Sequence, residues 1–179
     1  AYLLWYGDIL VAYGVTALVV VAFRDFSARK LAGLSLVFLS FLPVVELFAA
    51  FTIGGDAIAS GWAPAEAAIR QQAAAYRGGW GQQLSHRVPS SFSRQTVGLL
   101  NGSFWQIGGT MLLGMALYRW GVLTGERSAA LYRRLVAFGV VGLAITVAGG
   151  FYIGANAWGA DAALVWRQFR YVGSVPLPG

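Results

Sequence analysis

One apolar run, residues 31–53, constrains the fold of this chain more than any other feature. It reads LAGLSLVFLSFLPVVELFAAFTI, and Glu46 is its only ionisable residue. As an α-helix with a rise of about 1.5 Å per residue, the run would extend roughly 34 Å, enough to cross a hydrocarbon core of about 30 Å with some tilt. A soluble helix of this length would need a polar face, whereas serines are the only polar breaks before Pro43. We therefore predict a membrane span here, bent at the proline.

The composition of the whole chain favours the same class of protein. Of the 179 residues, 58% are hydrophobic and 11% are charged, against about 25% charged in an ordinary soluble domain. The net charge of +6 comes from basic residues spread over several connections. Because they form no single patch or stripe, we predict no nucleic-acid binding. The chain has no cysteine, so disulfides and thiolate metal sites are excluded. We predict no metal site, and the cofactor stays unknown because no nucleotide-binding or metalloprotease motif occurs.

Three further stretches have the length or the composition of membrane spans, namely residues 2–23, 96–118 and 131–153. With the run at 31–53 they predict an all-α, polytopic transmembrane helical bundle of about four spans, which forms one membrane domain over residues 1–179. We expect this domain to be a fragment of a longer protein, because the chain begins without methionine and ends soon after its last apolar stretch.

The connections between these spans differ in length and charge. Two are short and basic, RDFSARK at 24–30 and RWGVLTGERSAALYRR at 119–134. By the positive-inside tendency they face the cytoplasm, which places the long connection 54–95 and the tail 154–179 outside. The predicted location is therefore the bacterial cytoplasmic membrane, which the chain crosses several times, with the lipid bilayer as its main partner.

Local signals mark four helix boundaries. Residues 64–76 predict a helix in the long connection, because Pro64 suits a first helical position and Gly78 a stop. Ser27 and Ser128 precede the second and fourth spans, where a serine side chain caps a helix well. The outer connection is therefore expected to be partly helical.

Four polar side chains inside the predicted spans are candidates for chemistry: Asp8, Glu46, Asn101 and Gln106. By helix rise, the first three lie roughly 8 to 10 Å below the outer ends of three different spans, and Gln106 lies at about 15 Å. Intramembrane carboxylates usually face the bundle interior or a cavity. We therefore predict an outward-facing pocket in which Glu46 and Asp8 are candidate catalytic residues and Asn101 and Gln106 candidate substrate-binding residues. In the alternative, structural interpretation, Asp8 reaches the headgroups and Glu46 pairs with a neighbouring donor.

Pairs of glycines in the predicted spans are explained by helix packing. Two pairs have the small-xxx-small spacing of close helix packing, Gly98 with Gly102 and Gly150 with Gly154. We expect these pairs to pack within this chain rather than across a dimer, and we expect a bulky residue at Gly114 to disrupt packing.

His86 is the only histidine of the chain. A general base in an outer loop beside Ser85, Ser90 and Ser91 is one interpretation. A solvated loop histidine is favoured, because no carboxylate adjoins it in the sequence.

Two blocks carry a resemblance to a known family: LWYGDILVAYGVTAL followed by FRDFSARKL, and GGTMLLGMALYRWGVLTGERSAALYRRL. They resemble the middle segment of the YeiB-like family of bacterial multi-spanning membrane proteins, a domain of unknown function. The resemblance is sharpest at these positions: Trp5, 7–10, Tyr13, Arg24, Ser27, 111–118, Gly121, Gly125, Arg127, Ser128 and 132–134. Family members are about twice as long, so the resemblance implies that further transmembrane helices of a parent chain pack against this one. It also implies remote kinship with membrane acyltransferases of the heparan-alpha-glucosaminide N-acetyltransferase kind.

Three functions stay open. In the first, the chain is part of a membrane acyltransferase that modifies a small-molecule or glycan acceptor of the envelope. Asp8 and Glu46 would orient or deprotonate the acceptor hydroxyl, and the basic connections would lie near an anionic donor. In the second, the chain belongs to a transporter or exporter whose carboxylates bind a proton or a cationic substrate. The third is a structural membrane bundle without a site.

Overall fold

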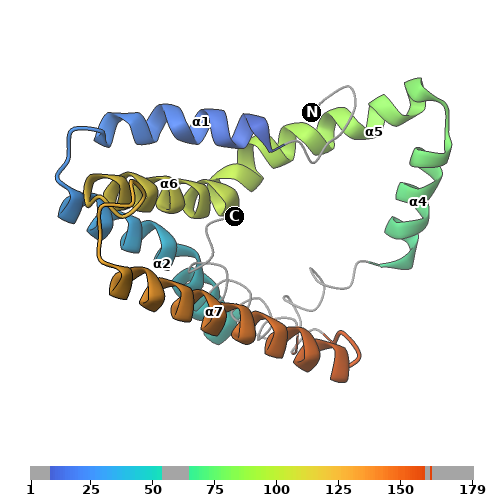
Figure 1. Ribbon diagram of the computed structural model, residues 1–179. Helices are drawn as coiled ribbons and strands as arrows, with labels where there is room; N and C mark the ends of the chain where they lie inside the picture. Colours follow the sequence, from blue (N-terminus) through green and yellow to red (C-terminus); the bar gives the residue numbers. More distant parts are fainter. Residues whose placement is uncertain (1–8, 54–64, 160–161, 163–179) are drawn as a thin grey trace. The chain divides into compact units, whose positions relative to one another are not determined.

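The computed structural model describes residues 9–53, 65–159 and 162, and every regular element in these ranges is helical (Figure 1). The all-α prediction is therefore confirmed. The elements, in chain order, are α1 (Leu10–Val20) with its 3-10 extension η1 (Val21–Phe23), α2 (Ala28–Ile53), α4 (Glu66–Arg77), α5 (Trp80–Ser93), the π-helical segment η2 (Arg94–Ser103), α6 (Phe104–Arg119) and α7 (Ala129–Ala155).

The chain divides into two compact units, and helix α2 contributes to both. The first unit comprises residues 1–42 and 64–116, and the second comprises residues 43–63 and 117–179. The unit boundary falls at Pro43, the proline inside α2. The helix stays α-helical through this position, which gives each unit a part of the same apolar segment.

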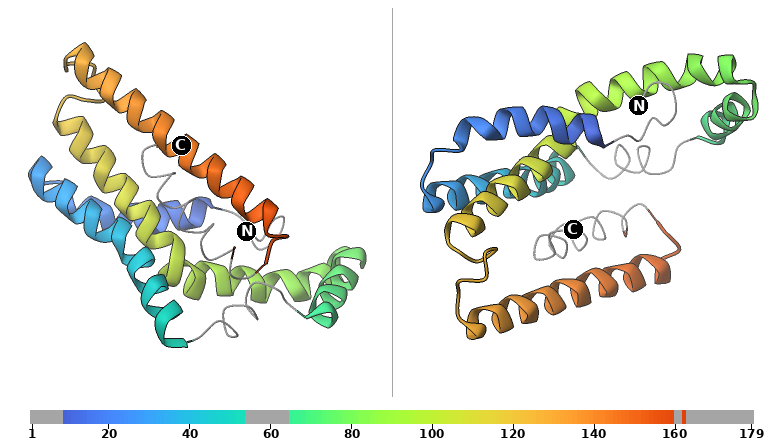
Figure 2. Two further views of the ribbon diagram at one scale, coloured as in Figure 1. Left: turned by 90° about the horizontal axis from the view of Figure 1, so that it is seen from below. Right: turned by 45° about the horizontal axis from the view of Figure 1, so that its top comes forward.

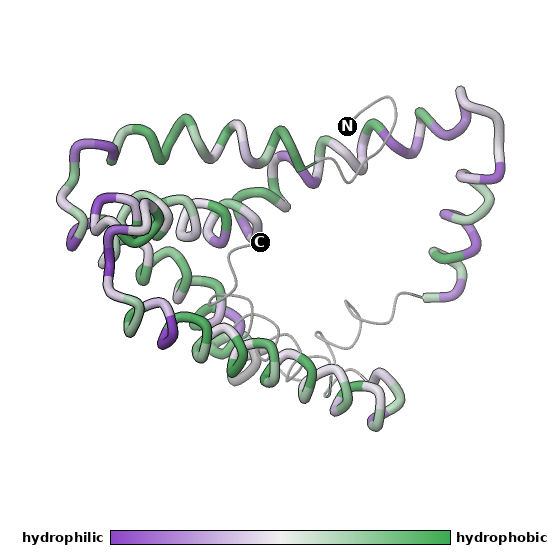
Figure 3. The backbone as a smooth tube through the Cα atoms, in the orientation of Figure 1, coloured by the Kyte–Doolittle hydropathy of each residue, from purple (hydrophilic) through white to green (hydrophobic). Residues whose placement is uncertain are grey.

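Helices α2 and α7 have the length and composition needed to cross a membrane, over Ala28–Ala49 and Ala129–Ala155. The spans predicted at 31–53 and 131–153 lie inside these two helices. Only 17% of the apolar window of α2 and 22% of that of α7 is buried. Figure 3 shows hydrophobic residues along most of α7, whereas α4 and α5 alternate in character. A helix in a soluble core would bury far more of such a surface.

The other two predicted spans differ from their prediction. The span predicted at 2–23 is described from residue 9 onward as the shorter apolar helix Leu10–Phe23. The span predicted at 96–118 is divided between η2 and the 16-residue α6, and it is not among the helices long and apolar enough to cross. The described residues therefore contain two candidate spans, and the count of about four is not confirmed.

The long connection is more helical than expected. Helix α4 confirms a helix in the region predicted at 64–76, and it ends before Gly78 as expected; the predicted start, Pro64, lies outside the described residues. The following segment, where we expected His86 to lie in a loop, forms α5 instead. Helix α5 continues without a break into η2 and α6 (Figure 2), so residues 80–119 follow one bent helical path. A proline disfavours a helix interior, but contacts of α5 with α4 and of η2 with α1 stabilise the helical path.

The core of the first unit is a junction of α1, α2 and α6 around two glycines. A Cβ atom at Gly108 would lie 3.0 Å from the ring of Phe38 and 3.4 Å from Cγ2 of Thr16. At Gly109 it would lie 2.7 Å from Cγ of Leu39 and 3.2 Å from the backbone nitrogen of that residue. The hydroxyl of Ser35 donates a hydrogen bond to the carbonyl oxygen of Gly109 at 2.8 Å. These small residues let α2 and α6 approach closely, as in many membrane helix pairs. We call this set the glycine junction.

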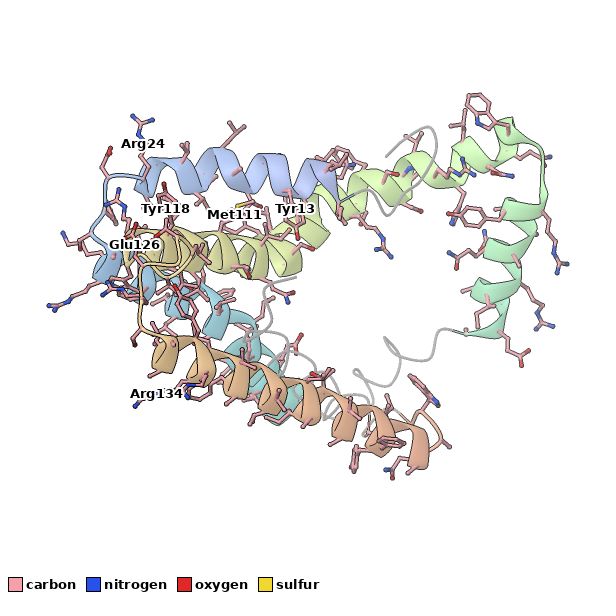
Figure 4. The ribbon with its side chains drawn as sticks, viewed as in Figure 1. Tyr13, Arg24, Met111, Tyr118, Glu126 and Arg134 are labelled. Carbon is pink, nitrogen blue, oxygen red and sulfur yellow. The ribbon has the colours of Figure 1, made fainter. Side chains whose placement is uncertain are left out.

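Aromatic rings extend the glycine junction along α2 and α6. Phe38 lies 5.7 Å from Phe104 and 5.1 Å from Trp105, and Phe41 stacks on Trp105 at 3.9 Å, all between ring centroids. Ser35 of α2 contacts Gly109 of α6, and Phe41, further along α2, contacts Trp105, which comes earlier in α6; the two helices are therefore antiparallel. Met111 lies on the side of α6 that faces α1 (Figure 4). The three helices α1, α2 and α6 thus pack against one another.

The glycines singled out in the sequence are not the packed ones. A Cβ at Gly102, Gly114 or Gly154 would meet no described atom within 4 Å, and one at Gly98 would meet only Ser93 and Arg94 of the same helical path. An alanine at Gly114 would therefore fit the described structure, and the effect of a bulkier residue there stays a prediction. The spacing of glycines does not reveal which of them faces a neighbour, because that depends on how each helix is rotated.

Candidate functional site

The four predicted site residues differ in exposure and in the unit to which they belong, and one of them is not described. Asp8 lies outside the described residues. Glu46 is half-buried on α2, one turn after Pro43, and belongs to the second unit. Asn101 and Gln106 are exposed and belong to the first unit. Their convergence on one outward-facing pocket stays a prediction.

Asn101 lies in the π-helical segment η2, which sequence reasoning did not foresee. A π-helical turn is wider than an α-helical one, and such turns are frequent at functional sites. The indole nitrogen of Trp105 donates to the carbonyl oxygen of Leu100 at 2.8 Å, across the end of this segment. The exposed amide of Asn101 offers both a donor and an acceptor to a ligand.

Gln106 lies one turn into helix α6 rather than in η2. Its carbonyl oxygen accepts a hydrogen bond from the hydroxyl of Thr110 at 2.8 Å, and the Gln106 residue is exposed. Because Gln106 is exposed, its side-chain amide is accessible to an external partner. Both candidate binding residues are thus accessible on the same helical path.

His86 lies on α5 and not in a loop, so that part of the prediction is wrong. Its ring meets the ring of Tyr76 edge-on, with 5.4 Å between centroids. The guanidinium of Arg87 lies 5.8 Å from the centroid of the Tyr76 ring and donates to the side-chain oxygen of Gln83. The amide nitrogen of Gln83 donates to the carbonyl oxygens of Tyr76 at 3.1 Å and Gly78 at 3.0 Å.

These contacts make the corner between α4 and α5 a fixed structural feature. Because the His86 ring packs against the Tyr76 ring of the neighbouring helix, we interpret His86 as a packed helix residue. Among the residues that the structure describes, no three histidine, aspartate or glutamate side chains are grouped to hold a metal ion. Neither observation indicates a catalytic centre in α4 or α5.

The turn between α6 and α7 is built on two glycines with left-handed backbone conformations. Gly121 has φ of +70° and Gly125 has φ of +80°, values that residues with a side chain rarely adopt. Gly121 donates its backbone N–H to the Tyr118 carbonyl at 2.9 Å, and Glu126 donates to the Gly121 carbonyl at 3.1 Å. The hydroxyl of Tyr132 donates to the Val122 carbonyl at 2.8 Å. The turn is therefore stabilised both by its own backbone hydrogen bonds and by a hydrogen bond from α7.

A cavity of about 430 Å³ adjoins this turn in the second unit. We call it the turn cavity, and its lining residues are Leu117, Trp120, Val122, Arg127, Leu131 and Leu135. The walls are apolar except for Arg127, whose Nε donates to the carbonyl oxygen of Trp120. Apolar walls with a single placed polar group are typical of ligand pockets, and the volume falls within their usual range.

Sequence reasoning treated this region only as a basic connection and missed the cavity. The signal was in RWGVLTGER, where two glycines four residues apart indicate a compact turn rather than a flexible link. Ser128 was expected to cap the following helix, and α7 does begin directly after it. Its side chain makes no capping hydrogen bond, but its carbonyl oxygen accepts from Leu131 at 2.9 Å.

Taken together, these observations define a class: in its described residues the protein is all-helical, with two apolar helices there that could cross a membrane. The chain is YeiB-like, since over 169 residues it is 32% identical to the Uncharacterized protein YeiB of Escherichia coli (strain K12). This finding confirms the resemblance carried by the two sequence blocks. The match covers 93% of this chain and 43% of that protein, so the chain spans less than half the length of the relative it matches. No family model and no solved structure matches the chain.

Proposed function

We propose that this chain forms part of a multi-pass membrane domain in the bacterial cytoplasmic membrane. The observation that carries the proposal is the exposure of large apolar side chains along α2 and α7. Leu36 is 67% exposed and Phe48 69% on α2, and on α7 Val136 is 67% and Phe151 76% exposed. Each side chain of this size contributes about 1.5–3 kcal/mol when it leaves water. A bilayer supplies that apolar environment on all sides of a helix.

The proposed topology has four crossings, through α1 extended by the residues before it, α2, the path of η2 and α6, and α7. The two short basic turns, at 24–27 and 120–128, then face the cytoplasm, and α4 and α5 lie outside. Support comes from the arginines at the ends of both turns and from the amphipathic character of α4 and α5. Helices that lie at a membrane surface have this mixed character.

Single cysteines test this topology, because the chain itself has none. In the intact protein, with cysteines outside this chain replaced, we expect Ser27→Cys and Ser128→Cys to react with a membrane-impermeant maleimide only after permeabilisation. Gln72→Cys, on the exposed side of α4, should react in intact spheroplasts. Labelling of Ser27→Cys and Ser128→Cys from opposite sides would refute a four-crossing topology.

As the activity, we propose acyl transfer to an acceptor presented on the outer side. The support is the kinship that the two sequence blocks imply, together with polar groups placed in apolar helices. Glu46 is half-buried in an apolar segment, where a carboxylate is retained mainly for function or pairing. In this proposal Glu46 and Asp8 orient or deprotonate the acceptor hydroxyl, and Asn101 and Gln106 hydrogen-bond it.

Glu46→Gln and Asp8→Asn in the intact protein test the activity. Glu66→Gln is the matched control, because Glu66 lies on exposed α4 and pairs only at the surface with Arg70 at 3.2 Å. Acylated envelope glycans are measured by mass spectrometry in cells that express each variant at equal membrane levels. We expect product to disappear with the first two variants and to stay unchanged with Glu66→Gln. Unchanged product in all three would refute the proposed roles.

A transporter that uses the same carboxylates is the second candidate. The half-buried Glu46 favours it equally, since intramembrane carboxylates also mark ion and proton pathways. The two functions differ in their product: a transporter mutant loses uptake or export of a solute while envelope acylation is unchanged. Assaying both in the Glu46→Gln strain separates them.

A further inference from the structure

The turn cavity has the construction of a lipid-binding site. Five of its six lining side chains are apolar or aromatic, and its volume is about 430 Å³. It lies beside the turn that joins α6 to α7, and α7 is one of the two helices long and apolar enough to cross a membrane. In the proposed topology the turn cavity lies at the cytoplasmic end of α7, next to the bilayer, so a hydrocarbon chain that enters from the bilayer would meet apolar walls.

Arg127 provides the polar end of this cavity. Its Nε donates to the Trp120 carbonyl, which fixes the plane of the guanidinium against the turn. In the part of the chain that the structure describes, Arg127 makes no second hydrogen bond or ion pair, and the residue is exposed. Its two terminal nitrogens can therefore donate in parallel to two oxygens of one phosphate, the geometry in which arginine binds anions best.

The charge around the turn favours an anion. Residues 119–134 contain four arginines and one acidic residue, Glu126. The carboxylate of Glu126 lies over Gly121, where a Cβ would be 2.7 Å from its Oε2. Arg134 projects outward from the first turns of α7 and does not line the cavity (Figure 4). The local excess of positive charge near a membrane surface attracts anionic lipids.

We propose that the turn cavity binds one anionic phospholipid, with the phosphate on Arg127 and part of one acyl chain among Leu117, Leu131 and Leu135. A free phosphate would use Arg127 but leave the apolar walls unfilled. A zwitterionic lipid would fill the walls but oppose the local charge with its own cation. The inference rests on the proposed membrane domain, but it does not depend on acyl transfer or on the roles of Glu46 and Asp8.

The test uses the intact protein, purified in detergent and stripped of lipid, with bound lipid counted by native mass spectrometry. The probes are dioctanoyl-phosphatidylglycerol, dioctanoyl-phosphatidylcholine and glycerol phosphate. We expect the first to bind at least about tenfold more tightly than the other two, which corresponds to about 1.4 kcal/mol. Arg127→Gln should weaken it by about tenfold, because a charge-assisted pair is lost. Glutamine keeps a donor for the Trp120 carbonyl, so the turn itself is preserved.

Two further variants make the result specific. Arg134→Gln removes the same charge from outside the cavity and should change the affinity for phosphatidylglycerol less than about twofold. Leu131→Phe narrows the cavity and should weaken the dioctanoyl lipid without affecting glycerol phosphate. An unchanged melting temperature with each variant shows that the fold persists, and Arg127→Lys should restore part of the affinity if folding is intact.

Three outcomes would overturn the proposal. Equal affinity for phosphatidylcholine would show an apolar groove without charge selection. Equal affinity for glycerol phosphate would show a phosphate site without a lipid chain. An equal effect of Arg127→Gln and Arg134→Gln would show diffuse attraction to the basic turn rather than a site.

Discussion

The glycine junction and the turn cavity are built from similar residues but are packed in opposite ways. At the junction, α2 lies so close to α6 that a Cβ at Gly109 would be 3.2 Å from a backbone atom of Leu39. At the turn, apolar side chains of comparable size leave about 430 Å³ open beside Arg127. Glycine serves close approach in the first region and left-handed backbone conformation in the second.

The difference indicates which region contributes to stability and which region can bind a ligand. A filled junction holds helices together by contact and leaves no room for a ligand. A cavity held open by a rigid turn contributes less to stability, but it retains space and a charged group. We therefore expect substitutions at the junction to act on unfolding, and those lining the cavity to act on ligand affinity.

The largest effect is expected for Gly109→Ala. The new methyl group would collide with Leu39, and overpacking of this kind costs about 1–3 kcal/mol. Gly114→Ala on the same helix is the matched control, since no described atom lies within 4 Å of the added carbon. Helix propensity alone favours alanine at both positions by up to about 1 kcal/mol. Thermal unfolding of the intact protein in detergent should therefore shift in opposite directions, and a parallel shift would contradict the packed junction.

Gly121→Ala should destabilise the turn by about 1–2 kcal/mol, the cost of a left-handed conformation for a residue with a side chain. Gly125→Ala incurs the same backbone cost but meets nothing within 4 Å, whereas at Gly121 the methyl also meets Glu126. Unfolding should thus rank Gly121→Ala as the more damaging of the two. Equal, negligible losses at both positions would show that the turn is not fixed in this conformation.

Ser35→Ala should cost about 0.6–1.7 kcal/mol, because it removes the hydrogen bond from the Ser35 hydroxyl to the Gly109 carbonyl. Ser40→Ala is the control, since Ser40 is exposed on the same helix. Both variants are compared by unfolding in detergent. If they lose the same stability, this hydrogen bond contributes nothing to the junction.

The smallest effect is expected for Thr16→Val. Thr16 is fully buried, and its hydroxyl has no hydrogen-bond partner among the described residues. Valine has nearly the same shape without the unsatisfied hydroxyl, so stability should stay equal or rise by up to about 1 kcal/mol. A clear loss of stability would mean that the hydroxyl has a partner in the intact protein, such as a helix outside this chain.

The sequence predicted the parts of the fold that depend on local patterns. The continuous apolar runs predicted α2 and α7, and the residues typical of helix starts and stops predicted α4. It missed α5, because Pro89 and its neighbouring serines suggest irregular structure when tertiary contacts are ignored. The π-helical segment η2 has no recognised signature in the sequence.

The candidate site was less predictable than the fold. The depth of Glu46 and Asn101 follows from helix rise, but their meeting in one pocket depends on helix rotation and on residues outside the described ranges. Likewise, glycine spacing pointed to Gly98 with Gly102 and to Gly150 with Gly154, whereas the close approach of α2 and α6 occurs at Gly108 and Gly109. The turn cavity depends on how Trp120 and the residues of α7 fold over the turn, which local patterns do not encode.

The most direct test asks whether the exposed apolar side chains face lipid. Val37 is 61% exposed and Val140 62%, whereas Leu39, two residues from Val37, is 7% exposed. Spin labels on cysteines at these positions are measured in the intact protein in bilayers, with oxygen as the lipid-soluble reagent and a nickel chelate as the water-soluble one. The account predicts high oxygen and low nickel accessibility at Val37 and Val140, and low accessibility to both at Leu39. High nickel accessibility at Val37 and Val140 would place them in water and contradict a membrane domain.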